Sequence, residues 1–256
     1  MSQDDCCYMQ VYEPRKRESK YSKKRYIRKV YYWRIAFFIS LVCVLVLVVS
    51  YFLIPKVVLE GSFEVVPQRY FFIVTSSHSN SSNADLAVVQ QRKLGNAGFV
   101  FNHEGSYMIV SQTFTNEFSA NLVLATLRSD GREASAKVHS FNINRLFFSE
   151  TDINLYRLFT YPTLLYTKIS EIQSELTQRK ISSEAIFLAI ENQANVLQNM
   201  FDEITDLNSP SYLKELYIEI YKAFKEFEKL SSTYSLTSAL RNLQASIAYN
   251  YLSIFA

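Results

Sequence analysis

An uninterrupted run of apolar residues constrains this chain more than any other feature. Residues 35–54 read IAFFISLVCVLVLVVSYFLI and contain no charged side chain. As a helix rising about 1.5 Å per residue, such a run is roughly 30 Å long, which matches the hydrocarbon core of a bilayer. The sequence therefore predicts a single transmembrane helix over residues 35–54.

Charge differs in sign on the two sides of this run. Residues 1–34 contain ten Lys and Arg against four Asp and Glu, whereas residues 55–256 contain seventeen against twenty. Because basic flanks remain on the cytoplasmic side of a cell membrane, we expect a largely disordered cytoplasmic tail over residues 1–34. The residues after the span should then be extracytoplasmic. A cleaved signal peptide is the alternative, but no small-residue cleavage site follows the run.

After a short stalk predicted over residues 55–68, the apolar pattern alternates between strand and helix periods. Strands are expected at 70–75, 99–103, 107–114 and 134–143, with helices at 84–94 and after 115. The order β-α-β-β-α-β packs two helices on one face of a four-stranded antiparallel sheet. We therefore predict an α+β fold with this split βαβ arrangement over residues 69–145.

Two stretches of this region match the pattern of a known family. Strand 70–75 leads into SSHSNSSNA at residues 76–84, where the family has a Gly-Ser-Phe-Ser-Asn-like loop before a helix. YMIVSQTF at residues 107–114 stands where the family has a Tyr-x-Val-x-Val-Gly-Pro-Phe run. The region thus resembles the SPOR domain of bacterial cell-envelope proteins. The resemblance implies binding to septal peptidoglycan glycan strands and a role in cell division or sporulation.

The resemblance also implies a set of ligand-binding residues, for a glycan or for a protein partner. Side chains alternate between the two faces of a strand, and five of the set should lie on the sheet face away from the helices: Phe72, Val74, Met108, Val110 and Gln112. The loop at the rim of this face adds Ser76, Ser77, His78, Asn80 and Asn83. The Ser and Asn run is equally typical of a plain loop and helix cap.

Four of the five face positions are apolar, which a soluble domain seldom leaves exposed. We therefore expect C-terminal helices or a partner to cover the face. Two hypotheses stay open: a peptidoglycan-binding protein, or a protein–protein scaffold whose SPOR-like sheet face has become a packing surface.

Residues 146–256 contain apolar residues at helical spacing in four segments, which start near Tyr161, Ser182, Pro210 and Ser235. Short connections between them favour an antiparallel bundle of about four helices. No family is recognised for this half.

No pattern in the chain points to catalysis. The three histidines, His78, His103 and His139, lack the paired spacing of a metal site, and neither a P-loop nor a GxGxxG motif is present. We expect a non-enzymatic protein without cofactor, metal or nucleic-acid partner. A hydrolase within the helical half is a third hypothesis.

Overall fold

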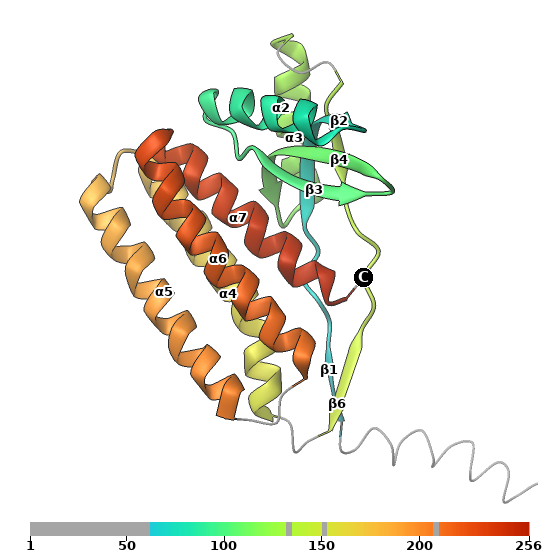
Figure 1. The fold of residues 1–256 in the computed structure, drawn as a ribbon, viewed down its shortest axis with the longest axis vertical. Helices are drawn as coiled ribbons and strands as arrows, with labels where there is room; N and C mark the ends of the chain where they lie inside the picture. Colours follow the sequence, from blue (N-terminus) through green and yellow to red (C-terminus); the bar gives the residue numbers. More distant parts are fainter. Residues whose placement is uncertain (1–61, 132–134, 150–152, 207–209, 256) are drawn as a thin grey trace, which may run out of the picture. The chain divides into compact units, whose positions relative to one another are not determined.

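The structure, a computed structural model, describes residues 62–131, 135–149, 153–206 and 210–255. It contains a four-stranded antiparallel sheet with the long C-terminal helices to one side of it (Figure 1). The strands lie in the order β3-β4-β2-β5. The elements of this part are β2 (Phe71–His78), α2 (Ser81–Lys93), β3 (Phe99–His103), β4 (Ser106–Phe114), α3 (Glu117–Ser129) and β5 (Lys137–His139). Figure 1 shows α2 and α3 over one side of the sheet and α7 on the other.

The β3–β4 connection is a tight hairpin. Glu104 and Gly105 have φ values of 51° and 76°. Positive φ at both central residues is the requirement of a two-residue type I′ turn, whose twist matches that of the paired strands. The strands pair from His103 with Ser106 to Phe99 with Val110.

A two-stranded ribbon that the sequence did not predict lies beside the sheet. Strand β1 (Ser62–Val65) pairs antiparallel with β6 (Leu146–Ser149), and Arg145 forms an ion pair with Glu64 at 2.7 Å. The prediction of a stalk over 55–68 is therefore wrong for residues 62–65, whereas 55–61 lie outside the described residues. A four-residue strand becomes recognisable only through its partner, and this partner is about eighty residues away.

Four helices make up the C-terminal half: α4 (Ile153–Thr177), α5 (Ser183–Asp206), α6 (Ser211–Thr233) and α7 (Leu236–Ser253). Helix α4 begins earlier than the expected start near Tyr161 and contains Pro162. In α6 eight side chains are buried, among them Tyr217 and Phe224, so this helix lies within the bundle. Helix α5 packs chiefly against α6 and is the outermost of the four (Figure 1).

The predicted fold class needs a correction concerning the membrane. None of the six helices among the described residues is long and apolar enough to cross a bilayer. The long ones, α4 to α7, carry polar side chains along their exposed faces, as amphipathic helices do. The segment predicted as a span, residues 35–54, lies outside the described residues. The structure is thus of mixed α+β class with no transmembrane helix in its described part.

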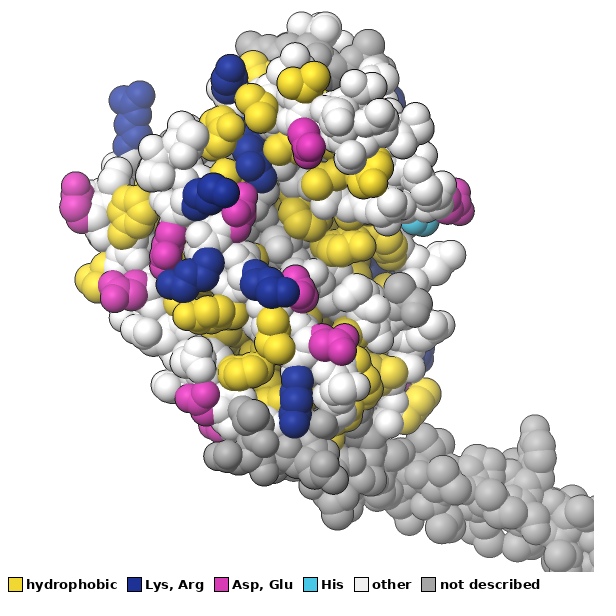
Figure 2. Space-filling view, in the orientation of Figure 1, with side chains coloured by type: hydrophobic (Ala, Val, Ile, Leu, Met, Phe, Trp, Pro, Cys, Tyr) yellow, Lys and Arg dark blue, Asp and Glu magenta, His cyan; other side chains and the backbone are white. Residues whose placement is uncertain are grey.

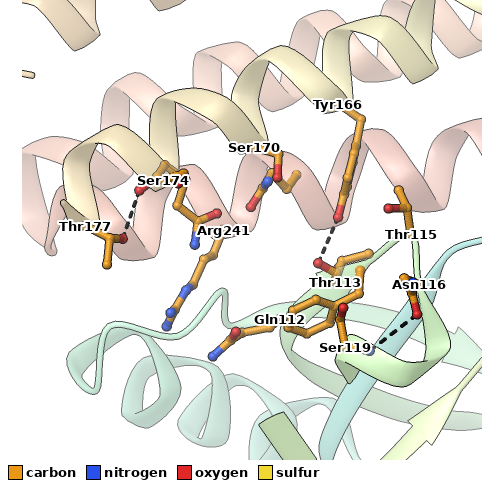
Figure 3. Close-up of a pocket in the computed structure, with 13 residues that line it drawn as sticks. Gln112, Thr113, Thr115, Asn116, Ser119, Tyr166, Ser170, Ser174, Thr177 and Arg241 are labelled. Carbon is orange, nitrogen blue, oxygen red and sulfur yellow. Dashed lines mark hydrogen bonds between the residues drawn. The ribbon is translucent and has the colours of Figure 1, made fainter. Parts of the chain in front are cut away.

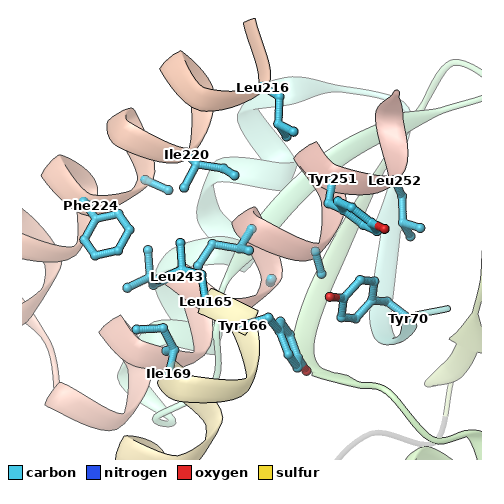
Figure 4. Close-up of a cluster of buried hydrophobic side chains, with 14 of the residues drawn as sticks. Tyr70, Leu165, Tyr166, Ile169, Leu216, Ile220, Phe224, Leu243, Tyr251 and Leu252 are labelled. Atoms are coloured by element: carbon cyan, nitrogen blue, oxygen red, sulfur yellow. The ribbon is translucent and has the colours of Figure 1, made fainter. Parts of the chain in front are cut away.

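The sheet and the helical half share one hydrophobic core. Phe72, Val74 and Val110 belong to the same cluster of buried side chains as Leu243 and Ala248 of α7. Three tyrosines join the layers at one end of this cluster (Figure 4): the Tyr70 ring centroid lies 4.7 Å from that of Tyr166 and 6.0 Å from that of Tyr251. The sheet face away from α2 and α3 is therefore covered by the chain's own C-terminal helix.

Hydrogen bonds fix α7 on the loop before β3. Ser238 Oγ donates to the Asn96 carbonyl at 2.6 Å, Asn242 Nδ2 to the Ala97 carbonyl at 3.2 Å, and Arg241 Nη1 to the Gly95 carbonyl at 3.0 Å. Three successive carbonyls thus accept from three side chains of one helix face. Because buried carbonyls are costly when unpaired, these bonds fix the position of α7 along the sheet.

Truncation of a sheet-face side chain tests this shared core. Phe72→Ala removes a ring that is 0% exposed and should lower the free energy of unfolding by about 3–5 kcal/mol. Phe118→Ala, at a phenylalanine that is 75% exposed on α3, should change it by less than about 0.5 kcal/mol. Urea unfolding of the full chain followed by circular dichroism measures both. Equal effects of the two variants would contradict the covered sheet face.

Candidate functional site

The four apolar residues of the predicted ligand-binding face are all buried. Phe72, Val74 and Val110 are at most 1% exposed, and Met108 is 8% exposed. Their neighbours on this side are side chains of α7 and aromatic rings such as Phe101 and Phe141. In the folded chain these positions contribute to packing.

The fifth face residue, Gln112, is displaced by an irregularity in the strand pairing. Phe72 pairs with Thr113 and Ile73 with Gln112, but Val74 pairs with Val110, so β4 has one extra residue at this point. Directly opposed residues share a face, and a one-residue shift moves side chains to the other face. Thr113 therefore lies on the side of Phe72, where alternation alone had predicted Gln112.

The rim residues make local contacts. His78 Nε2 lies 3.1 Å from Ser76 Oγ, and Asn80 Oδ1 accepts a hydrogen bond from the Ser82 amide at 2.7 Å, which caps α2. Ser77 and Asn83 are exposed. The stretch from β2 to α2 is thus a strand end and a helix cap.

A polar pocket lies where β4 ends, next to the sheet face rather than on it. Its volume is about 250 Å³, and side chains from β4, α3, α4, α7 and the β4–α3 connection line it (Figure 3). Most of the lining is hydroxyl or amide: Gln112, Thr113, Phe114, Thr115, Asn116, Ser119, Tyr166, Ser170, Gln173, Ser174, Thr177, Arg241 and Gln244.

Local folding rules position the walls of this pocket. Asn116 Oδ1 accepts from the amides of Phe118 and Ser119 at 2.8 and 3.4 Å and so begins α3 beside the end of β4. Tyr166 Oη donates to the Thr113 carbonyl at 2.8 Å, which joins α4 to β4. The tyrosine is almost completely buried, and burial raises the pKa of its hydroxyl, so it stays a neutral donor.

Two polar atoms in the lining residues are buried without a partner among the described residues. They are Thr113 Oγ1 and Arg241 Nε. Thr113 is 8% exposed, and most buried hydroxyls in proteins form a hydrogen bond.

A single charged side chain sets the electrostatics of the pocket among its described lining residues. Arg241 is the one charged residue among those that line it, and neither a carboxylate nor an imidazole is present in that set. Burial lowers the pKa of the Arg241 guanidinium. An arginine remains protonated in proteins even so, so the pocket carries a positive charge.

Of the ten predicted ligand-binding residues, Gln112 is the one that lines this pocket. Sequence reasoning missed the rest of the lining, although the sequence contains one signal. Helix α7 has a single charged residue, Arg241, among eighteen. A lone charge on an otherwise uncharged, largely apolar helix indicates either a specific partner or a site. The other lining residues carry no such signal, because they lie on four elements that meet only in the fold.

The structure also brings together two histidines whose sequence spacing suggested no relation. The ring centroids of His103 and His139 are 4.7 Å apart, beside Phe141. Burial lowers the pKa of His139, with His103 and Lys137 acting in the same direction and Glu104 against it. Groups of three or more metal-ligating side chains are not found in the described residues.

Comparison with known proteins gives one distant structural likeness. Over 30% of this chain and 96% of the other, the structure is similar to the peptidoglycan binding domain of CwlC, a cell wall lytic enzyme of B. subtilis, with a TM-score of 0.26 and 17% sequence identity. No protein-family model matches the chain, and no curated protein matches it.

Two buried threonines of the sheet should respond oppositely to the loss of a hydroxyl. Thr75 Oγ1 donates to the Ile109 carbonyl at 3.3 Å, so Thr75→Val should cost about 1 kcal/mol of unfolding free energy. Thr113 Oγ1 has no partner in the described residues, so Thr113→Val should be neutral or stabilising by up to about 1 kcal/mol. Urea unfolding measures both, and a larger loss at Thr113 would show that its hydroxyl is paired within the chain.

The histidine pair predicts a pH dependence of stability. Because the pKa of folded His139 lies below the ordinary value of 6.5, the unfolded chain binds more protons. Stability should therefore be greatest above pH 6.5 and fall as the pH drops toward the folded pKa. His139→Gln should make the fall between pH 7 and pH 5 shallower in urea unfolding. An unchanged slope in this variant would contradict the assignment.

Proposed function

We propose that this protein binds peptidoglycan glycan strands of the bacterial cell envelope in the polar pocket, without catalysing a reaction on them. One observation carries the proposal: a pocket of about 250 Å³ at the end of β4 has walls that are mostly neutral hydroxyl and amide side chains. Sugar hydroxyls and acetamido groups are the complementary donors and acceptors for such a lining. The half-buried Phe114 adds a ring for an apolar sugar face.

The class of ligand comes from the SPOR resemblance of residues 69–145. The SPOR resemblance would place the ligand on the sheet face away from α2 and α3, but in this chain α7 packs on that face. The proposal therefore assigns the ligand to the pocket at the end of β4, which includes the last residues of the YMIVSQTF stretch. A role outside the cell membrane, in cell division or sporulation, belongs to the same proposal.

The lining also favours binding over bond cleavage. Glycoside hydrolysis generally uses two carboxylates on either side of the scissile bond. The described residues that line this pocket include neither Asp nor Glu. Such a site would hold a glycan and release it unchanged.

Filling the pocket should abolish binding to cell walls. Ser170→Trp introduces an indole from α4 into the pocket, whereas Thr167→Trp adds the same group to an exposed position of α4 that does not line it. In sedimentation with purified peptidoglycan, wild type and Thr167→Trp should enter the pellet and Ser170→Trp should remain in the supernatant. Equal sedimentation of all three would reject the pocket as the site.

Protein–protein contact is the second candidate function, and the surface of α5 and α6 favours it. Phe187 and Leu188 are 44% and 60% exposed, and a hollow of about 300 Å³ between these helices has a largely apolar lining that includes Ile218 and Tyr221. Figure 2 shows hydrophobic side chains on this view of the molecule, interspersed with basic and acidic ones. Apolar patches of this kind commonly mark contact surfaces.

The sedimentation experiment also separates these two functions. If the wild-type chain does not associate with peptidoglycan at all, the glycan proposal fails and the scaffold function is favoured. Association that Ser170→Trp abolishes supports the glycan function.

A further inference from the structure

Two hollows join into one groove along the contact between α5 and α6. One has a volume of about 350 Å³ and begins at Phe187, and the other has a volume of about 300 Å³ and reaches Phe201. Gln198 and Tyr221 line both hollows, so the two are continuous. From Phe187 to Phe201 this α5–α6 groove follows about four helical turns and is roughly 21 Å long.

Apolar side chains in this groove are open to solvent. Phe187, Ile218 and Tyr221 are 44%, 40% and 38% exposed. Helix α5 packs chiefly against α6 at the outer side of the bundle (Figure 1), so the described part of the chain leaves the groove uncovered. Burial of such a stripe against a second surface is favourable.

The α5 side of the groove is acidic. Helix α5 contains five Asp and Glu but neither Lys nor Arg. Glu184, Glu191 and Asp202 are exposed, and their spacings of seven and eleven residues place them within about 20° of one another around the helix. Glu191 lines the groove, so the three form an acidic rim along it. None of the three forms an ion pair with another described residue.

The α6 side of the groove is basic. Four lysines lie within about 80° of one another around this helix: Lys214, Lys222, Lys225 and Lys229. Lys222 and Lys225 line the groove, and they form ion pairs with Glu219 and Glu228 of the same helix at 2.6 and 3.1 Å. Exposed pairs of this spacing are weak, so these lysines can also pair with carboxylates of a second surface.

A surface with one acidic rim, an apolar stripe and one basic rim is complementary to itself. Interfaces with twofold symmetry require this property, because both copies use the same patch. A twofold axis parallel to the antiparallel helices α5 and α6 places α5 of each copy on α6 of the other, so acidic rims meet basic rims. An axis perpendicular to the helices would instead place α5 on α5, with like charges opposed, which is unfavourable.

We propose that the protein forms a homodimer through the α5–α6 groove, in which four antiparallel helices, two from each copy, enclose the apolar stripe. Glu191 and Lys225 line the same hollow and therefore lie at similar heights along the groove. Rotation about an axis parallel to the helices keeps these heights, so Glu191 of each copy faces Lys225 of the other. The groove shares no lining residue with the polar pocket, so this inference does not depend on glycan binding.

Charge reversal tests the pairing across the twofold axis. Glu191→Lys opposes two lysines at both symmetric contacts, and Lys225→Glu opposes two carboxylates. Each variant alone should self-associate about tenfold more weakly than wild type. In an equimolar mixture of the two variants, the mixed dimer has opposite charges at both contacts, so association should return to within about threefold of wild type. Asp85→Lys, at an exposed position of α2, is the charge-reversal control and should associate as wild type does.

A polar substitution tests the apolar stripe. Ile218→Asp should weaken association about tenfold or more, because it places a carboxylate in the centre of the contact. Leu122→Asp is the matched control on α3, where the leucine is 59% exposed, and should leave association unchanged. Circular dichroism should show both variants folded, since both side chains are exposed in wild type.

Sedimentation equilibrium of the full chain in density-matched detergent measures these associations. Wild type that stays monomeric up to its solubility limit would overturn the inference and favour a different protein as the occupant of the groove. A dimer that Ile218→Asp does not weaken would place the contact elsewhere and also overturn it. A mixture that associates no better than the separate variants would overturn the proposed axis. The peptidoglycan experiment reports on the polar pocket alone, so either proposal can fail without the other.

Discussion

The contact between α7 and the loop before β3 is the interaction on which the rest of the structure depends. Ser238, Arg241 and Asn242 donate to three consecutive backbone carbonyls of residues 95–97. Because these donors lie on one helix face, they fix both the position and the rotation of α7. Its apolar side chains then meet the sheet, and α4 and α6 pack against α7 in turn.

This docking decides which surfaces are available for binding. It buries the apolar face that includes Phe72 and Val110, and it creates a polar pocket where α4 and α7 pass the end of β4. The same irregularity that lets β2 and β4 pair around Val74 turns Thr113 toward this side of the sheet. A single packing arrangement thus removes one candidate surface and forms another.

Much of the local structure could be predicted from residue patterns. Alternating apolar residues predicted strands near β2, β3 and β4, and Gly105 marked the hairpin turn, because these signals depend on neighbours in the chain. Helical spacing predicted four C-terminal helices for the same reason. Strands β1 and β6 carry no such signal, since each is only four residues long and is stabilised by the other.

The sequence by itself determined the periodic elements and the apolar character of the face formed by Phe72, Val74, Met108 and Val110. Because exposed apolar surface is unfavourable in water, the sequence also indicated that another part of the chain or a partner packs on this face. Only the tertiary structure decided that α7 is the cover and that Thr113 rather than Gln112 shares the face. It also decided that Arg241 lines a polar pocket in which none of the other described lining residues is charged. These depend on contacts between residues up to about 145 positions apart, and such contacts leave no periodic trace in the sequence.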